Sequence, residues 1–339
     1  MKEILGKLLA GEVLGDDETA ALVEYLTAED LDQVVAGAAL AALRTRGETA
    51  AEVRVFARGL QDLAVRPAID DVSDAVDVVG TGGDASGSLN LSTGAALLAA
   101  AAGARVVKHG NRSVSSRSGS FDVLAALGLD VPWDAARAGQ VFAATGFTYL
   151  FAPGFHPAMK SVAPVRQAMG ARTIFNLVGP LANPARAPHL VVGAFSPEMA
   201  RMMAETLAGM DIARAFVVHG EPGWDEPTPV GPYLLLDVLP GRVVETEEDP
   251  AEFGFPRCPP QALLGGDPEV NAAAIRRVFD GERGAHRDAL VLGATLALRV
   301  TGVGREQARE RAETALGEGH ATDLLSNLVA MAEQEPVGV

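Results

Sequence analysis

Short β-branched runs alternate with helical segments from about Asp74 onward, and this alternation constrains the fold more than any other feature of the sequence. The runs at 77–79 and 104–108 each lead into a glycine-containing loop, and further strand-like runs lie at 147–151, 190–195, 215–219 and 233–238. Alternating strands and helices are typical of an α/β domain with a mainly parallel sheet. Ligands of such sheets bind beyond the carboxyl ends of the strands. We therefore expect a ligand site where the glycine-rich loops lie.

The segment before the first strand has a helical pattern throughout. Its apolar residues recur at three- and four-residue spacing, and it contains no strand pattern. Thr27 with Asp30 and Thr49 with Glu52 are interpreted as capping boxes. The sequence thus predicts an N-terminal helical domain over residues 1–70 and an α/β domain over 71–339. Within the second domain, the Pro- and Gly-rich residues 223–232 are expected to form a surface connection, and residues 267–331 to return to helices.

Composition narrows the class of protein. The chain has 339 residues, 48% of them hydrophobic, which excludes a disordered protein. A net charge of -16 disfavours extended binding of nucleic acid, whereas a local site for a small anion stays compatible with it. Cys258 is the single cysteine, so no intramolecular disulfide and no Cys-rich zinc site are expected. An acidic block stands where a signal peptide would be cleaved, and we expect a cytoplasmic protein.

Residues 80–93 form the first loop with chemical content, between a predicted strand and a predicted helix. Glycines allow the backbone N–H groups to turn toward a phosphate, and Ser92 and Thr93 add hydroxyls at the positive end of the helix. The loop is not a dinucleotide fingerprint, because Ala85 stands where the third glycine would be, and no Gly-Lys-Ser/Thr of a P-loop follows. We predict a phosphate-binding loop, with a tight turn as the alternative.

The second loop, residues 108–120, concentrates positive charge in an acidic protein. It contains Lys108, Arg112, Arg117, several serines and two glycines. Such a density of donors indicates a polyphosphate or sugar-phosphate ligand, and a basic surface loop is the alternative. His109 taken alone is more typical of a structural histidine than of a base.

Two further segments supply an anion anchor and a metal site. Pro164 interrupts a helical pattern that carries Arg166 and Arg172, either of which can bind a carboxylate or phosphate in a bidentate manner. Adjacent Asp225 and Glu226 follow a strand, and such carboxylates suit Mg²⁺ that also holds substrate phosphates. The alternatives are a surface arginine on an amphipathic helix and a solvated acidic pair.

Five motifs in these segments resemble those of the anthranilate phosphoribosyltransferase family in order and spacing. They are GTGGD with N-x-S-T, KHGNR-x-x-SS-x-SGS, FHPAMK-x-VAPVR, G-x-RT-x-FN-x-x-GPL-x-NP and HG-x-x-G-x-DE. The resemblance covers nearly the whole chain. It implies a small all-helical domain hinged to a larger α/β domain with a mainly parallel central sheet, of the nucleoside phosphorylase and phosphoribosyltransferase type. Helices within about 165–190 would join the helical domain.

The resemblance also implies an activity and its partners. The enzyme would transfer the 5-phosphoribosyl group of 5-phosphoribosyl 1-diphosphate (PRPP) to the amine of anthranilate, giving N-(5-phosphoribosyl)anthranilate and diphosphate, in tryptophan biosynthesis. It would use Mg²⁺, with two ions per monomer, and form a homodimer through the helical domain. No nucleic acid or membrane partner is expected.

The site residues implied by the resemblance form three groups. Those around PRPP are Gly80, Gly83, Asp84, Ser88, Asn90, Leu91, Ser92, Thr93, Lys108, His109, Gly110, Asn111, Arg112, Ser113, Val114, Ser115, Ser116 and Ser120. Those around anthranilate are Gly80, Asn111, His156, Arg166, Gly179 and Pro180. The metal would be held by Ser92, Asp225 and Glu226. No general base is assigned, because an aryl amine is already a neutral nucleophile, and Lys108, Asn111 and Arg166 would act by positioning.

Two other functions are alternatives to this one. A pyrimidine nucleoside phosphorylase would share the architecture and use inorganic phosphate, but KHGNR-x-x-SS together with VAPVR is not expected in it. A nucleic-acid-binding relative should show a basic groove, which the net charge of -16 disfavours. Phe121 and Trp224 depart from the family pattern at loop positions, and we expect them to affect loop packing.

Overall fold

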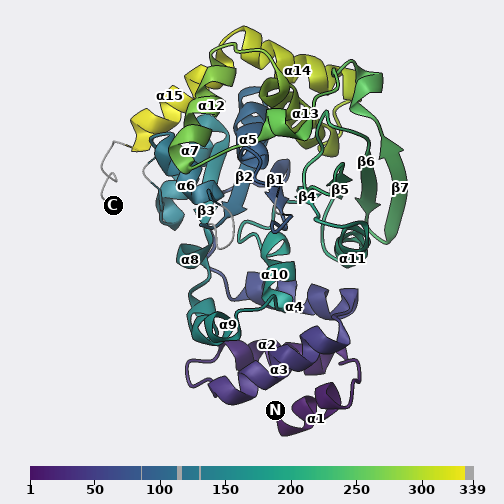
Figure 1. The fold of residues 1–339 in the computed structure, drawn as a ribbon. Helices are drawn as coiled ribbons and strands as arrows, with labels where there is room; N and C mark the ends of the chain where they lie inside the picture. The colour runs from purple at the N-terminus through teal and green to yellow at the C-terminus, as the bar shows by residue number, and fades with distance from the viewer. Residues whose placement is uncertain (85, 113–116, 130, 333–339) are drawn as a thin grey trace.

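The computed structural model describes residues 1–84, 86–112, 117–129 and 131–332, which form two lobes. A helical lobe at the bottom of Figure 1 holds the N-terminus, and a larger lobe above it contains the sheet. The helical lobe begins with four helices, α1 (Lys2–Leu9), α2 (Asp16–Thr27), α3 (Gln33–Arg46) and α4 (Ala50–Asp62). In the described residues no helix is long and apolar enough to cross a membrane.

One sheet organises the larger lobe. Its described strands are β1 (Ala75–Gly80), β2 (Arg105–Gly110), β3 (Phe147–Phe151), β4 (His189–Gly193), β5 (Arg214–Gly220), β6 (Tyr233–Leu239) and β7 (Arg242–Glu248). They lie in the order β3-β2-β1-β4-β5-β6-β7, with parallel pairing from β3 to β5 and antiparallel pairing of β6 and β7. The predicted mainly parallel sheet is confirmed. Strand order reverses at β1 and β4, where ligands of open α/β sheets bind.

Further helices follow β1 in the chain. These further helices are α5 (Leu91–Ala101), α6 (Ser120–Ala126), α7 (Ala135–Thr145), α8 (Ala152–Phe155), α9 (Ala163–Met169), α10 (Ile174–Val178), α11 (Pro197–Ala208), α12 (Pro268–Phe279), α13 (Ala285–Val300), α14 (Arg305–Gly317) and α15 (His320–Ala332), with 3₁₀ turns at Pro157–Lys160, Gly179–Leu181, Pro250–Phe253 and Pro260–Leu263. Of these, α9 and α10 pack against α3 and α4 of the helical lobe. Helices α5 and α13 pack very closely, since a Cβ at Gly94 would lie 2.6 Å from Leu290 Cδ2. Alanine-rich α5 is therefore a core helix.

Two apolar clusters divide the interior, one on each face of the sheet. Along β5, Phe216 and Val218 belong to the cluster that contains α5, α12 and α13. Ala215 and Val217 belong to the other cluster, which also contains side chains of α1 to α4, α9, α10 and α11. This period-two alternation is that of a strand buried on both faces. The core of the helical lobe is thus continuous with one face of the sheet.

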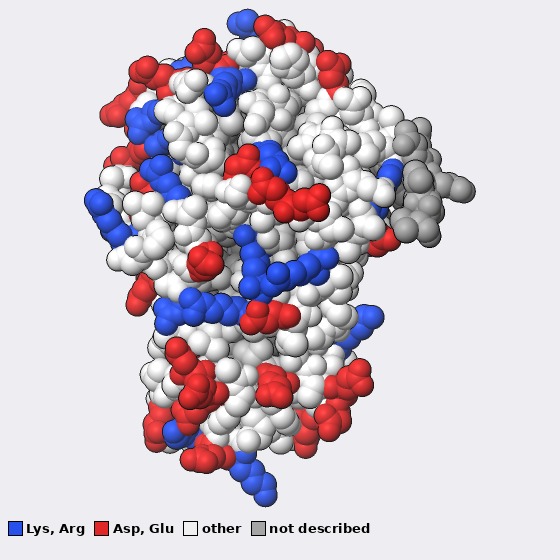
Figure 2. Space-filling view, turned by 180° about the vertical axis from the view of Figure 1, so that it is seen from behind, with Lys and Arg blue, Asp and Glu red and all other residues white. Residues whose placement is uncertain are grey.

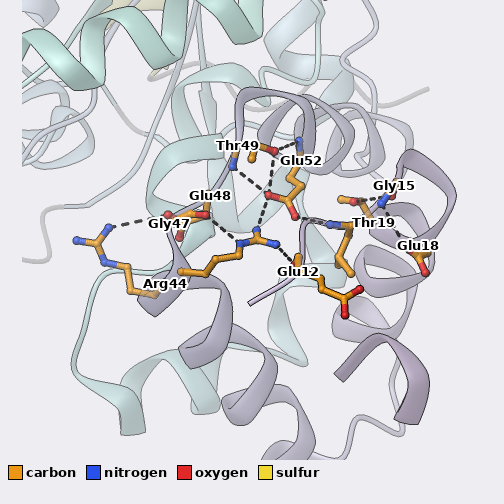
Figure 3. Close-up of polar contacts among 11 residues, drawn as sticks. Glu12, Gly15, Glu18, Thr19, Arg44, Gly47, Glu48, Thr49 and Glu52 are labelled. Atoms are coloured by element: carbon orange, nitrogen blue, oxygen red, sulfur yellow. Dashed lines mark hydrogen bonds and ion pairs between the residues drawn. The ribbon is translucent and has the colours of Figure 1, made fainter. Parts of the chain in front are cut away.

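A buried carboxylate fixes the turn between α3 and α4 (Figure 3). Glu52 accepts hydrogen bonds from Leu14 N at 3.1 Å and Thr49 N at 3.0 Å, and it pairs with Arg46 at 2.5 Å. The predicted Thr49 capping box is present. The one predicted at Thr27 is wrong: Thr27 ends α2, and its hydroxyl donates to the Val23 carbonyl at 2.8 Å.

Arginines join the two lobes at their waist. Arg58 of α4 donates to the Gly209 carbonyl after α11 at 2.5 Å, and Arg186 pairs with Asp62. Figure 2 shows basic side chains gathered on the rear surface where the lobes meet, above a helical lobe with many acidic side chains. A carbonyl at a helix C-terminus is a favourable place for a cation, so the Arg58 contact stabilises the arrangement of the two lobes.

Two further sequence expectations differ from the structure. Strand β7 was not predicted, because its sequence RVVETEE is that of an exposed edge strand without a clear apolar alternation. Residues 223–232 are not the surface connection that was expected: Trp224, Asp225 and Thr228 are buried, and Trp224 packs in the core that contains α5. Gly223 takes a positive φ of 114°, and a Cβ at Gly231 would lie 2.6 Å from Glu221 Cβ, so the two glycines serve a turn and a close approach.

Candidate active site

The segment with Asp225 and Glu226 packs directly on the carboxyl ends of β1 and β4. A Cβ at Gly80 would lie 2.5 Å from Asp225 Oδ2, and a Cβ at Gly193 would collide with the Asp225 carbonyl oxygen. Gly82 N donates to Asp225 Oδ2 at 2.6 Å. Only glycine at Gly80 and Gly193 allows this approach, which brings the glycine-rich loop and the acidic pair together.

Asp225 and Glu226 form a charged cluster with Asp84 that carries excess negative charge. Glu226 Oε1 accepts a hydrogen bond from Ser92 N at 3.0 Å, at the start of α5. Burial, reinforced by repulsion from Glu226 and Asp84, raises the pKa of Asp225, and burial raises the pKa of Glu226 to about 7. Buried carboxylates are stabilised by a cation.

A divalent cation fits this donor set in one particular way. The described residues contain no cluster of three or more His, Cys, Asp or Glu side chains arranged to hold a metal. Mg²⁺ is usually held by one or two carboxylates together with waters and substrate phosphates. The pair Asp225 and Glu226, with the Ser92 hydroxyl, matches that mode of binding.

Lys108 is buried rather than extended into its loop. Its side chain is 2% exposed, and its ammonium donates to the Val78 carbonyl. Burial lowers the pKa of Lys108, while the nearby charges of Asp77 and Glu226 oppose that change. Lys108 therefore lies near Asp77 and Glu226 and balances part of their charge.

Two histidines lie in contact between the lobes. The rings of His109 and His156 have centroids 5.1 Å apart, and both side chains are buried. Burial lowers the pKa of His109 to about 3 and also lowers that of His156, so both rings are neutral at pH 7. Both Nε2 atoms are therefore buried polar atoms without a hydrogen-bond partner among the described residues.

The second loop is braced by amide and hydroxyl contacts. Asn90 Nδ2 donates to the Ser118 carbonyl at 3.0 Å, and Asn90 Oδ1 accepts from Asn271 at 2.8 Å. Ser120 Oγ lies 3.1 Å from the Tyr149 hydroxyl and donates to the Asn111 carbonyl at 3.3 Å. These contacts fix the described ends of the loop against Asn90 and Tyr149. Predicted residues Ser113, Val114, Ser115 and Ser116 lie outside the described part of the chain.

The remaining predicted donor residues also lie near these contacts. Ser88 Oγ is 3.0 Å from Ser86 Oγ, and Asp84 bonds Ser86 within the glycine-rich loop. Leu91, Ser92 and Thr93 form the first turn of α5. Arg112 stacks on Phe121, 4.3 Å from its ring centroid, which gives Phe121 a packing role. Gly110 ends β2.

Arg166 is a half-buried cation with no carboxylate partner among the described residues. It lies on α9, with its guanidinium carbon 5.4 Å from the Phe175 ring centroid, and burial lowers its pKa. The guanidinium of Arg172, by contrast, already has partners within the protein: it donates to the Gly83 carbonyl at 2.8 Å and stacks on Phe195. Of the two arginines, Arg166 is the one free to bind an anion.

Gly179 and Pro180 open the 3₁₀ turn that follows α10. Gln61 of α4 donates to the Leu181 carbonyl at 2.9 Å and fastens this turn to the helical lobe. Pro180 is buried at the joint between the lobes.

Sequence reasoning missed Asp77 and Asn183. Asp77 is fully buried in β1, and its Oδ2 accepts a hydrogen bond from Asn183 Nδ2 at 2.8 Å. An acid inside the apolar run AVDVV was a signal that could have been noticed. Nothing in the sequence pairs it with a residue about a hundred positions away.

The fold and the site together define a class of protein. Residues 2–64 match the helical bundle domain of a glycosyl transferase family, and residues 72–322 match its a/b domain. The glycine-rich loop, the acidic pair and the free arginine lie in the second match or at its border with the helical lobe.

Individual relatives narrow the class further. The chain is 41% identical over 333 residues to anthranilate phosphoribosyltransferase of Rhodospirillum rubrum, covering 98% of this chain and 95% of the relative. It is 42% identical to that of Rubrobacter xylanophilus, covering 98% of each. The crystal structure of the Thermus thermophilus enzyme superposes with a TM-score of 0.91 at 42% identity, covering 98% of this chain and 99% of the other. The chain belongs to the anthranilate phosphoribosyltransferase family.

Proposed function

We propose that this protein transfers the 5-phosphoribosyl group of PRPP to the amine of anthranilate, in tryptophan biosynthesis. The bond from ribose C1 to diphosphate breaks, a bond from C1 to the amine nitrogen forms, and the amine releases a proton. The observation that carries this proposal is the pairing of two unlike subsites. A glycine-rich loop with a buried acidic pair suits a metal diphosphate, and an unpaired half-buried Arg166 suits a carboxylate.

The donor subsite would hold PRPP at the ends of β1 and β4. Asp225, Glu226 and the Ser92 hydroxyl would bind magnesium, two ions per monomer, together with diphosphate oxygens. When bound, Mg²⁺ neutralises the charge of the departing diphosphate. A yeast anthranilate phosphoribosyltransferase of the same fold, 23% identical with a TM-score of 0.88, was solved with PRPP and Mg. Backbone N–H groups of the loop and the first turn of α5 supply further donors.

The acceptor subsite would hold anthranilate between the lobes. Arg166 and Asn111 would bind anthranilate, with Arg166 on its carboxylate, and His156, Gly179 and Pro180 would line its route. No general base is needed, because an aryl amine is neutral at pH 7. The protein accelerates the reaction by aligning the amine with C1 and by stabilising the leaving group as charge develops.

The helical lobe is also the proposed dimer interface. A hollow of about 310 Å³ lies between α3 and α9, lined by Gln33, Val34, Gly37, Ala38, Val165, Ala168 and Met169. Val34 is 83% exposed beside it, and Leu9 of α1 is 69% exposed. Large exposed apolar side chains around a hollow are typical of a protein interface, and a second copy of this lobe is the proposed partner.

The experiment that tests the function follows the loss of anthranilate fluorescence in a mixture of protein, PRPP and Mg²⁺. We expect turnover that depends on PRPP and stops in excess EDTA. Turnover of a nucleoside with inorganic phosphate, without any consumption of anthranilate, would instead identify a nucleoside phosphorylase. Undiminished anthranilate turnover in EDTA would refute the metal site.

A further inference from the structure

Strands β1 and β2 separate just before the site. Within these described strands, β1 pairs with β2 at Ala75 and Val76, whereas it pairs with β4 from Val76 to Gly80. Strand β2 continues to pair with β3 through Gly110. Backbone groups between β1 and β2 that a regular ladder would satisfy must therefore find other partners.

Side chains take the place of the missing ladder. Asn183 Nδ2 donates to the Val107 carbonyl at 2.8 Å, and Asp77 Oδ1 accepts from His109 N at 3.2 Å. These two backbone groups belong to the peptide bonds on either side of Lys108. The Lys108 ammonium in turn donates to the Val78 carbonyl across the gap.

Asp77 and Asn183 also hold each other. Asn183 Nδ2 donates to Asp77 Oδ2 at 2.8 Å, and Asn183 Oδ1 accepts from Ala185 N at 2.9 Å. Both side chains are buried, and the bonds that join Asp77, Asn183, Val107 and His109 are shielded from water. The pair thus fixes the backbone of Lys108 from both sides and places a negative charge near its ammonium.

We propose that Asp77 and Asn183 are positioning residues of the donor subsite, which act through Lys108. This inference rests on the proposed function, in which Lys108 lies beneath the metal diphosphate. Because both side chains are buried, the pair would act without contacting substrate. It keeps β1 and β2 apart, directs the Lys108 side chain into the gap, and so holds a positive charge opposite Glu226.

A purely structural role predicts a different outcome from a positioning role. Loss of a purely structural bond lowers the stability of the protein and weakens the binding of both substrates to a similar degree. Loss of the pair should selectively weaken PRPP binding, because Lys108 lies on the donor side of the site. Anthranilate binding should change little, because Arg166 and its helix keep their contacts.

The test compares Asp77→Asn with Glu52→Gln. Glu52 is an equally buried carboxylate that accepts backbone N–H groups in the helical lobe, so its variant is a matched control for lost stability (Figure 3). Steady-state kinetics, calorimetric titration with PRPP in Mg²⁺, and melting temperatures are measured on full-length protein. We expect Asp77→Asn to raise the KM and Kd for PRPP about 10-fold or more, with the anthranilate KM changed less than about twofold.

A second variant keeps the test decisive if Asp77→Asn fails to fold. Asn183→Ser keeps one donor for two acceptors, so it should fold and show a smaller loss of PRPP affinity in the same direction. Wild-type PRPP affinity in both variants overturns the inference, as does an equal loss in Glu52→Gln. Calorimetry tests the pair even if wild-type protein fails to consume anthranilate, a result that would count against the proposed function alone.

Discussion

Replacement of Arg166 by alanine should weaken anthranilate binding and leave the protein stable. The guanidinium is half-buried on α9, stacks on Phe175, and has no carboxylate partner among the described residues. Burial of an unpaired charge costs free energy, which the lowered pKa of Arg166 reflects. The alanine variant is released from that cost, so its melting temperature should stay at or above the wild-type value.

The expected loss of affinity follows from the charge of the substrate. A charge-assisted hydrogen bond is worth about 1.5–3 kcal/mol, which corresponds to about a 10- to 150-fold change in binding. Arg166→Ala should raise the anthranilate KM by that factor and leave calorimetric PRPP binding within about twofold of wild type. Fluorescence assays at saturating PRPP give the first value, and titration gives the second.

Two further variants sharpen the comparison. Arg166→Lys keeps a charge and loses the bidentate fork, so it should fall between wild type and alanine. Arg201→Ala removes an exposed arginine of α11 that pairs with Glu245 and belongs to neither subsite, so it should change the binding of neither substrate. If Arg166→Ala lost PRPP affinity and kept its anthranilate KM, the assignment of substrates to the two subsites would be wrong.

Three other predictions concern the metal, the dimer and pH. The double variant Asp225→Asn with Glu226→Gln should need more Mg²⁺ and turn over more slowly. Without metal at pH 8 this variant should melt no lower than wild type, because the raised pKa values of both carboxyl groups mean that ionising them is unfavourable in the fold. Light scattering should give twice the 35.1 kDa chain mass for wild type and the chain mass for Val34→Asp, with Val270→Asp, an exposed valine of α12, as a dimeric control. The pKa of His109 is about 3 in the fold and about 6.5 when unfolded, so the unfolded chain binds more protons between these values and stability falls as pH drops through that window. His109→Gln should reduce the slope of urea-derived stability against pH by about 1.4 kcal/mol per pH unit, and an unchanged slope would contradict the assignment.

The sequence predicted the sheet better than the contacts between its loops. Local patterns identify strands such as β3, whose observed bounds equal the predicted run at 147–151. Strand β7 escaped because an edge strand facing water needs no apolar alternation. Residues 223–232 were misjudged because Pro and Gly mark both exposed turns and backbone pressed against a neighbour, and only the position of Asp225 over Gly193 distinguishes the two.

The site was predictable where chemistry is local and hidden where it is not. Glycines, cations and the acidic pair stand in short motifs, so their ligand class could be inferred from composition of each loop. The burial of Lys108 could not be inferred, because it follows from the separation of β1 from β2, a property of the folded sheet. Asp77 and Asn183 lie far apart in the chain, and no periodicity links them.

The continuous core between the helical lobe and the sheet has a consequence for dissection of this chain. The family matches end at residue 64 and resume at residue 72, yet Ala215 and Val217 of β5 share one apolar cluster with α1 to α4. A fragment that starts at the second match would keep α11 on that face of the sheet, but it would lack α1 to α4 and with them the partners of α9 and α10. Evolutionary modules and cooperative folding units therefore do not coincide here, and heating should melt both lobes in a single transition.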